Sequence, residues 1–204
     1  DNGYLFHSIL SSVINIGILN PEDIVEVISK YQDKIPLNSY EGYIRQLFWR
    51  EYQRYCYIYF DFTKKNYFGN KEKLGKEWYT GEVGCEPVDD CIKKSFDQGY
   101  LNHIQRLMIM GNYMNLSGID PWEALRWFIE FSCDSYEWVM YQNVLEMAFC
   151  ISGGRTGGGT MQKPYISSSN YILKMSNYKK GEWSEKWDEL YHAFLKKHNK
   201  KLQP

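Results

Sequence analysis

Three observations predict an all-α fold. No stretch alternates apolar and polar residues with the period of two that marks a half-buried strand. Several stretches instead carry apolar residues at helical spacing behind residues that favour a helix start. The chain of 204 residues is 44% hydrophobic and 17% aromatic, which is ample for a helical core. We find no repeat and no strong domain boundary, and we therefore expect one helical domain over residues 1–204.

The first two helices are expected before residue 36. Residues 4–19 form an apolar run, which we interpret as a loop that enters a helix with Ser8, Ser11 and Ser12 near its start. Hydroxyls and free backbone N–H groups at a helix start suit a phosphate, and plain N-capping explains the same serines. Asn20 then caps a second helix, which Pro36 ends.

A third helix is expected to begin near Ser39 and to carry residues 42–60. Gln46, Trp49 and Arg50 stand at positions i, i+3 and i+4 of this helix, so they share a face. Such a polar, aromatic and cationic cluster is typical of a ligand wall, whereas a structural pair between Arg50 and Glu51 explains it equally well. Residues 63–86 are rich in Lys, Gly and Asn and are expected to form a surface loop.

Residues 99–144 are expected to form two helices packed back to back, after a helix that opens at Pro87. Asp120 can cap the second of these two helices, and Pro121 occupies the first position of that helix. His103 and Arg106 share a face of the first helix, and Asp134 lies near the end of the second. Groups this polar need partners on otherwise apolar helices. They form either a structural ion pair with a satisfied histidine or a functional site.

The end of the chain is expected to contain a loop and an amphipathic helix. Residues 153–160 are glycine-rich but lack the GK[ST] ending of a phosphate-binding P-loop, so we expect a flexible loop. Residues 184–201 are expected to form the last helix. Ser184 caps its start and lysines lie at its end, as the helix dipole favours.

The composition excludes some classes of function. The net charge is −1, so any nucleic-acid surface must be local. Five cysteines form no CxxC pair, which indicates reduced thiols in the cytoplasm and predicts no metal site. No apolar run approaches the ~18 residues of a membrane span, so no membrane is expected as a partner. Because the chain starts at Asp1 without Met, we expect it to be cut from a longer protein.

The central residues carry a resemblance to a known family. Residues 101–108 (LNHIQRLM), 118–121 (GIDP) and 134–139 (DSYEWV) stand in order. They resemble the flavin-binding half of the photolyase/cryptochrome family, and in particular its bacterial photolyase-related branch, whose motif is HHIQRLM followed by DAYEWV. This resemblance favours the functional interpretation. It implies a helical FAD-binding domain without the N-terminal antenna domain of full-length members.

The resemblance also implies a set of FAD contacts. Residues 7–11 (HSILS) resemble the TSxLS phosphate loop of the family, with His7 in place of its threonine. Arg106 and Asp134 match the Arg–Asp pair beside the flavin. The full set of implied FAD-binding residues is His7, Ser8, Ile9, Leu10, Ser11, Gln46, Arg50, Arg106, Asp134, Tyr136 and Tyr141.

Three residues take the implied catalytic roles. Residues 45–51 (RQLFWRE) resemble the QxxWRE form of a family motif that members acting on (6-4) photoproducts, and many cryptochromes, carry. His103 falls where those members place a catalytic histidine, and it would donate a proton to the lesion. Gln46 would orient the flipped base by hydrogen bonds, and Trp49 would stack on it. Light would excite reduced FAD, and an electron would pass to damaged DNA and return.

The sequence departs from the family in two places, and it leaves the function open between related alternatives. The cysteines that hold an iron–sulfur cluster in related photolyases are missing after residues 174–178 (KMSNY), so no cluster is expected. Val144 stands where other branches place a tryptophan that relays electrons. The alternatives to repair are a cryptochrome-like photoreceptor, and a flavin domain that needs a separate antenna-domain chain. Four lysines either contact DNA phosphates or are simply solvated: Lys163, Lys174, Lys179 and Lys180.

Overall fold

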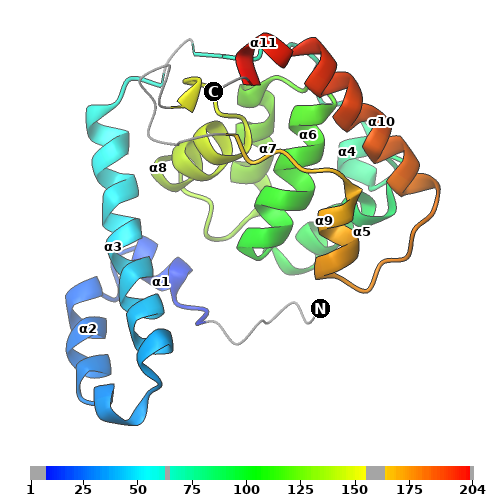
Figure 1. The fold of residues 1–204 in the computed structure, drawn as a ribbon. Coiled ribbons are helices and arrows are strands. Elements are labelled where there is room, and N and C mark those ends of the chain that lie inside the picture. Colours follow the sequence, from blue (N-terminus) through cyan, green and yellow to red (C-terminus); the bar gives the residue numbers. More distant parts are fainter. Residues whose placement is uncertain (1–7, 63–64, 155–163, 203–204) are drawn as a thin grey trace. The chain divides into compact units, whose positions relative to one another are not determined.

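The fold is all-α, as predicted. A computed structural model describes residues 8–62, 65–154 and 164–202 (Figure 1). Within these ranges there is no strand, and the only β-type pairing is an isolated parallel bridge between Glu72 and Ile119. The described residues fall into two compact units, an N-terminal unit (8–61) and a C-terminal unit (62–202). Each unit is described here by itself.

The N-terminal unit consists of short helices followed by one long helix. Its elements are α1 (Ser11–Asn15), α2 (Pro21–Ser29), a single 3-10 turn η1 (Gln32–Lys34) and α3 (Leu37–Tyr59). The predicted start signals for α2 hold, with Asn20 at the N-cap and Pro21 at the first helical position. Helix α3 begins directly after Pro36, two residues earlier than expected, because proline is well tolerated just outside a helix start.

The C-terminal unit contains the remaining helices. They are α4 (Glu77–Thr80), α5 (Glu86–Gln98), η2 (Gln105–Gly111), α6 (Asn112–Leu116), α7 (Pro121–Phe131), α8 (Glu137–Met140), η3 (Tyr141–Ala148), α9 (Ser169–Met175), α10 (Glu182–Lys197) and α11 (Asn199–Leu202). Both η2 and η3 are π-helices. Such segments are rare and are frequently found at functional sites. None of the described helices is long and apolar enough to cross a membrane.

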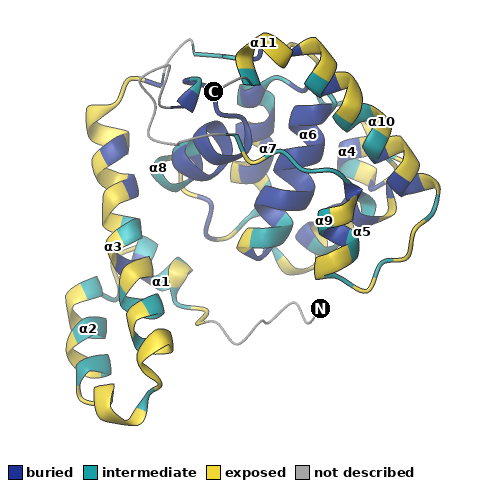
Figure 2. Cartoon of the chain, in the orientation of Figure 1, coloured by how far each residue is buried: buried dark blue, intermediate teal, exposed yellow. Residues whose placement is uncertain are grey.

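The core of the C-terminal unit lies where η2, α6, α7 and η3 meet (Figure 2). Met110, Trp127 and Leu145 are completely buried there. The second predicted helix is divided, because α7 ends at Phe131 and α8 and η3 follow after a turn, and η3 packs against both η2 and α7. The segment formed by α8 and η3 thus provides a surface that both η2 and α7 contact. The predicted start of α7 is confirmed, because the Asp120 carboxylate accepts hydrogen bonds from the N–H groups of Trp122 and Glu123.

The segment 65–86 corrects the prediction of a surface loop. It contains the short helix α4, and its residues Phe68, Trp78 and Cys85 are buried. The indole N–H of Trp127 donates to the carbonyl oxygen of Trp78 at 3.0 Å, which anchors the segment to α7. The polar composition of the segment hid these anchors, because each is a single residue without periodicity.

The predicted last helix is present, but it differs at both ends, because α10 stops at Lys197 and a separate short helix, α11, follows. Helix α10 begins at Glu182, with Gly181 rather than Ser184 at the N-cap. Ser184 still serves the helix start, because its hydroxyl accepts a hydrogen bond from Gly181 N–H and donates one to the Gly181 carbonyl oxygen. The predicted glycine-rich loop lies mostly outside the described residues, as does Lys163.

Candidate functional site

A buried ion pair lies at the centre of the site in the C-terminal unit. Arg106 comes from η2, and Asp134 comes from the turn between α7 and α8 rather than from the helix end that was predicted. Nη2 of Arg106 lies 2.8 Å from Oδ1 of Asp134. The same Nη2 donates to the carbonyl oxygen of Leu101 at 3.0 Å. Both side chains are buried, so each charge depends on the other for compensation.

The turn that carries Asp134 is held to the end of α5. The N–H of Cys133 donates to the carbonyl oxygen of Gly99 at 2.8 Å. Gly99 ends α5 in the left-handed conformation, with φ of 60°, which favours glycine. Because the arginine is also bonded to Leu101, a short stretch after α5 positions both members of the pair.

His103 lies three residues before Arg106, in the first turn of the same helix. Its side chain is exposed, in contrast to that of Arg106. The pKa of His103 is lowered below 6.5, by desolvation first and by the positive charge of Arg106 second. Since the imidazole contacts water, desolvation is incomplete, and the charge of Arg106 is the cause that the ion-pair geometry supports independently. The imidazole is therefore mainly neutral at pH 7.

Asn143 opposes this shift through a side-chain hydrogen bond with His103, which raises the pKa of the imidazole. The amide group of Asn143 donates through Nδ2 to the carbonyl oxygen of Val139 at 3.1 Å. That bond leaves the amide oxygen as the atom that accepts from an imidazole N–H. Asn143 lies on η3 and His103 lies two residues before η2, so this hydrogen bond joins η3 to the turn that leads into η2.

Two buried polar atoms next to the ion pair have no hydrogen-bond partner among the described residues. They are Nε of Arg106 and the hydroxyl oxygen of Ser135. Buried polar groups are nearly always bonded, so such atoms fit a polar ligand at this place. A flavin ring system, which carries both donors and acceptors, meets this requirement.

The predicted pocket tyrosines have different surroundings. Tyr136 is partly exposed beside Asp134. Tyr141 donates its hydroxyl to the carboxylate of Glu137 at 2.8 Å. The ring of Tyr141 packs edge-on against Phe62 and Trp122, with centroid distances of 5.4 and 5.9 Å. These contacts are those of a packing residue, so a flavin contact at Tyr141 stays a prediction.

The predicted phosphate loop lies at the start of α1 in the N-terminal unit. His7 is outside the described residues. Leu10 is the N-cap residue of α1, and Ser11 is its first helical residue. Ser8 and Ile9 are exposed, and the Ser8 hydroxyl accepts a hydrogen bond from Tyr43 at 3.4 Å.

Helix α3 carries the predicted ligand face of the same unit. Arg50 donates to the carbonyl oxygen of Ile14 at 3.3 Å and also pairs with Glu51, and a flavin contact at this arginine stays a prediction. Trp49 stacks on Tyr52 with a centroid distance of 5.2 Å, and Gln46 is exposed. The predicted site residues therefore fall into two groups, one in each unit, and each group is ordered by contacts of its own.

The predicted phosphate-contacting lysines lie on the C-terminal unit. Lys174, Lys179 and Lys180 are exposed. The last two line an open cavity of about 520 Å³ at the start of α10, and the carboxylates of Glu86 and Glu182 line it too. This mixture of charges weakens the attraction for phosphate.

Known proteins resemble this chain over different shares of its length. A (6-4) photolyase of Agrobacterium fabrum is 36% identical over 218 aligned residues, which include all of this chain and 42% of that protein. A mitochondrial deoxyribodipyrimidine photo-lyase of Saccharomyces cerevisiae is 24% identical over 152 residues, 69% of this chain and 25% of that protein. This chain belongs to the photolyase/cryptochrome family. It spans less than half the length of either of these relatives.

A viral protein also resembles part of this chain. An uncharacterized protein of Acanthamoeba polyphaga mimivirus is 53% identical over 89 residues, 43% of this chain and 69% of that protein. No protein-family model matches the chain.

Sequence reasoning missed several residues that complete the site. Asn143 and Ser135 were not among the predicted residues, although Ser135 follows Asp134 directly. The carbonyl oxygen of Leu101 could not be found from side-chain patterns, because it is a backbone atom. Asn143 would have been found if the apolar face of the predicted helix had been searched for amides near His103.

Proposed function

We propose that this chain is the catalytic domain of a light-dependent DNA repair flavoprotein of the (6-4) photolyase type. One observation carries the proposal: the buried pair of Arg106 and Asp134 lies next to an exposed His103, in a chain that resembles a (6-4) photolyase over its whole length. The residue types at these three positions are those that the resemblance implies.

The proposed cofactor is FAD, and its proposed contacts are those that the resemblance implies. In the C-terminal unit they are Arg106, Asp134, Tyr136 and Tyr141, and in the N-terminal unit Ser8, Ile9, Leu10, Ser11, Gln46 and Arg50. When bound, reduced FAD supplies a light-driven electron. Arg106 has an unused Nε donor for a ring acceptor, and Asp134 keeps the net charge of the pair at zero, so the pocket does not repel an anionic ring.

His103 is the proposed acid toward the lesion. Its exposure lets the imidazole reach a bound base, and the Asn143 oxygen holds one ring N–H, which leaves the other ring nitrogen to hold and release a proton. The positive charge of Arg106 opposes protonation of His103. A negative charge on the bound lesion or its phosphates would therefore favour the protonated imidazole.

Gln46 and Trp49 are the proposed contacts to the flipped base. Both lie on α3, and the exposed amide of Gln46 has donor and acceptor atoms for a base edge. Trp49 offers a flat surface for stacking. Damaged base pairs lower the cost of flipping, which favours lesions over intact DNA.

The lowered pKa of His103 favours a second candidate function. An imidazole that is neutral at pH 7 is a weak acid catalyst, and a cryptochrome-like photoreceptor needs none. In that function the chain would bind FAD and respond to light without repairing DNA. A third alternative is a flavin domain that works only with a separate antenna-domain chain.

An absorbance spectrum followed by illumination tests these alternatives. The purified chain is loaded with FAD, reduced, and illuminated with an oligonucleotide that contains a (6-4) lesion. Loss of the lesion in light but not in darkness supports repair. A flavin spectrum with a light response but no repair supports the photoreceptor, and repair that needs added antenna chain supports the third alternative. Failure to bind any FAD would overturn all three.

A further inference from the structure

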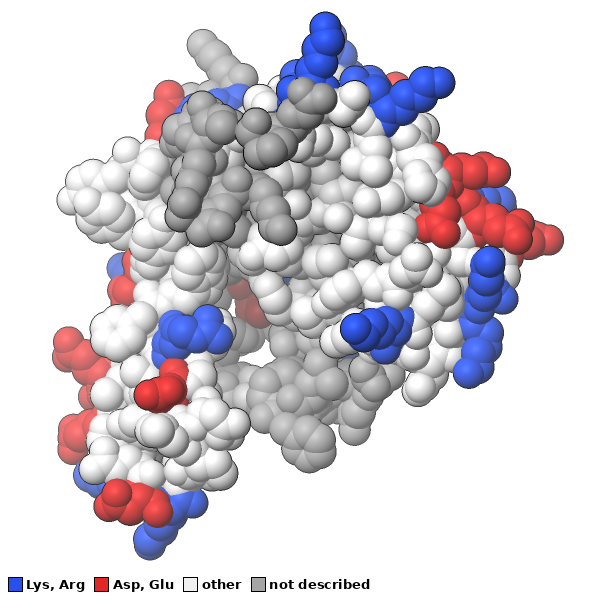
Figure 3. All heavy atoms as spheres, viewed as in Figure 1, with Lys and Arg blue, Asp and Glu red and all other residues white. Residues whose placement is uncertain are grey.

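The charges of α10 are segregated along its length. Its first half contains Lys186 and four acidic residues, Glu182, Glu185, Asp188 and Glu189, whereas residues 190–202 contain four lysines and no acidic residue. Figure 3 shows the same division, with blue side chains over α11 and the end of α10, and red side chains over the beginning of α10. Lysines in the last turn of a helix favour its dipole, and Lys196 and Lys197 hold this position in α10, as Lys200 and Lys201 do in α11.

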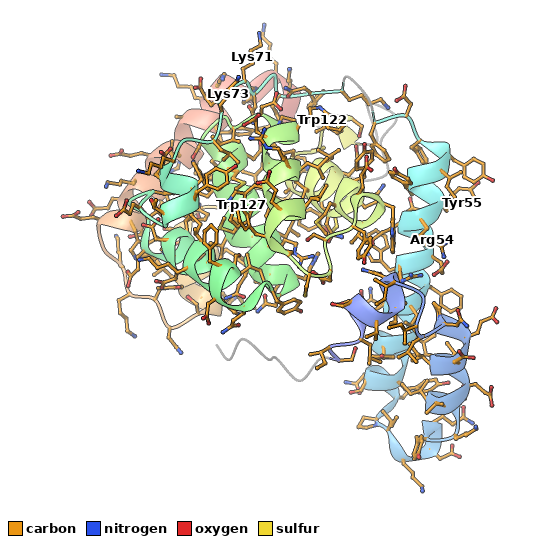
Figure 4. The ribbon with its side chains drawn as sticks, turned by 180° about the vertical axis from the view of Figure 1, so that it is seen from behind. Arg54, Tyr55, Lys71, Lys73, Trp122 and Trp127 are labelled. Atoms are coloured by element: carbon orange, nitrogen blue, oxygen red, sulfur yellow. The ribbon has the colours of Figure 1, made fainter. Side chains whose placement is uncertain are left out.

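A second segment brings more lysines to this end of the helix. The hydroxyl of Tyr67 donates to the carbonyl oxygen of Lys201 at 3.2 Å, and the Lys201 ammonium lies 5.0 Å from the centroid of the Tyr67 ring. Phe68 packs against His198 at a centroid distance of 5.0 Å. Lys71 and Lys73 follow directly, and Figure 4 shows them at the edge of the molecule that α10 and α11 also occupy.

We call these residues the basic surface: Lys71, Lys73, Lys196, Lys197, Lys200 and Lys201. All six are exposed, and no described carboxylate lies within ion-pair distance of any of them. Glu72 separates two of them, but its Cγ lies beside Gly118, toward the turn between α6 and α7. The lysines therefore repel one another unless an external anion lies among them.

An extended polyanion fits this surface better than a membrane does. A membrane-binding helix needs exposed large apolar side chains beside its lysines, and residues 182–202 expose none. Lysines that come from two chain segments, without an apolar neighbour, suit the regularly spaced phosphates of a duplex.

We propose that the basic surface binds the sugar–phosphate backbone of duplex DNA without regard to sequence or damage. This inference rests on the proposed function in taking DNA as the substrate, and it assigns the phosphate contacts to lysines other than Lys174, Lys179 and Lys180. The surface would raise the rate of encounter with DNA and hold the duplex while lesions are found.

His198 provides a reporter for binding at this surface. The imidazole is buried between Phe68 and Phe194, and its Nε2 has no hydrogen-bond partner among the described residues. Its pKa is lowered by burial and then by the charges of Lys197 and Lys201, which are the charged groups that act on it. Phosphates that offset these two charges therefore raise the pKa of His198.

The test measures the affinity of the chain for an undamaged duplex in darkness as a function of salt. One variant combines Lys71→Gln, Lys73→Gln, Lys197→Gln and Lys200→Gln, and it keeps Lys201 because that lysine holds α11 to Tyr67. The matched variant combines Lys174→Gln, Lys179→Gln, Lys180→Gln and Lys186→Gln. In parallel, NMR follows the pKa of His198 with and without the duplex, with a His198→Gln variant to assign its signals.

The logarithm of the binding constant falls linearly with the logarithm of the salt concentration. We expect the first variant to reduce the size of this slope by about 0.9 for each phosphate contact removed, and the matched variant to reduce it less. We also expect DNA to raise the pKa of His198. Equal effects of the two variants, an unchanged slope in the first variant, or binding to anionic lipid vesicles instead of DNA would each overturn the inference. Repair of a lesion in light is measured separately on the unchanged chain, so failure of the proposed function is distinguishable from failure of this one.

Discussion

The guanidinium of Arg106 and the carboxylate of Asp134 lie 2.8 Å apart in the interior of the C-terminal unit, although 28 positions separate them in the chain. Two buried charges stabilise a fold only together, because either one alone has lost its water without gaining a partner. This relationship gives the first prediction.

Asp134→Asn should lower the free energy of unfolding by about 3–5 kcal/mol, because it leaves the buried guanidinium without its countercharge. Urea denaturation measures the loss. The double variant Arg106→Met, Asp134→Leu should recover part of it, since it removes both charges. As a control, Glu123→Gln breaks an exposed pair with Arg126 and should change stability little. A double variant no more stable than the single one would contradict this account.

His103→Ala should abolish most of the light-dependent repair while FAD remains bound. Loss of a general acid typically costs about 10²–10⁴-fold in rate. Because His103 is exposed, the melting temperature should hardly change. His192→Ala, at another exposed histidine on α10, is the matched control and should repair normally. Normal repair by the His103 variant would show that the assigned acid is wrong.

Asn143→Ala should lower the pKa of His103 further, because the hydrogen bond that it removes is the one contact that raises this pKa. NMR titration of the imidazole measures the shift. If His103 is the acid, repair should increase as the pH falls from 7 through the pKa of His103, and the variant should need a lower pH for the same rate. An unchanged pKa in the variant would mean that Asn143 serves only to hold Val139.

His198→Phe should make folding stability less sensitive to acid. Because burial lowers the pKa of His198 in the folded chain, the unfolded chain binds a proton more readily once the pH falls below about 6.5. Stability therefore falls through this range in the unchanged chain, whereas above it both forms are neutral and the residue contributes no pH dependence. Chemical denaturation at pH 7.5 and 5.5 measures the difference. An identical fall in the variant would assign the acid sensitivity to other groups.

Gly111→Ala should destabilise the chain by about 1–3 kcal/mol through overpacking. A Cβ at Gly111 would lie 2.6 Å from Cβ of Ala148 and 3.2 Å from the carbonyl oxygen of Arg106. The matched variant is Gly42→Ala, because no atom lies within 4 Å of a Cβ there. It should stabilise α3 by roughly 0.5–1 kcal/mol, since alanine favours helix more than glycine does. Thermal unfolding of both variants should show shifts of opposite sign.

The sequence predicted the features that local chemistry determines. The start of α7 follows from Asp120 and Pro121 alone. The turn at Asp134 was predicted as the end of a helix, because no glycine or proline stands between Phe131 and Tyr136 to mark the break.

Other features depend on contacts between distant residues. Nothing near Trp78 indicates that its carbonyl oxygen accepts a bond from Trp127, 49 positions later. The orientation of Asn143 toward His103 depends on how η3 packs against η2. A resemblance to a family indicated the residue types of the site, but their partners and pKa directions required the structure.

The π-helical form of η2 limits how the chain can vary in length. His103 lies before this segment and α6 lies after it, so the segment determines the angular position of the histidine about the helix axis. Each α-helical residue turns the chain by about 100°, because a turn holds 3.6 residues. Deleting one residue within Gln105–Gly111 would convert the wide turn to an ordinary one and rotate His103 away from Asn143. A change of a single residue in length within Gln105–Gly111 would therefore move His103 relative to Asn143 even if every side chain of the site were kept.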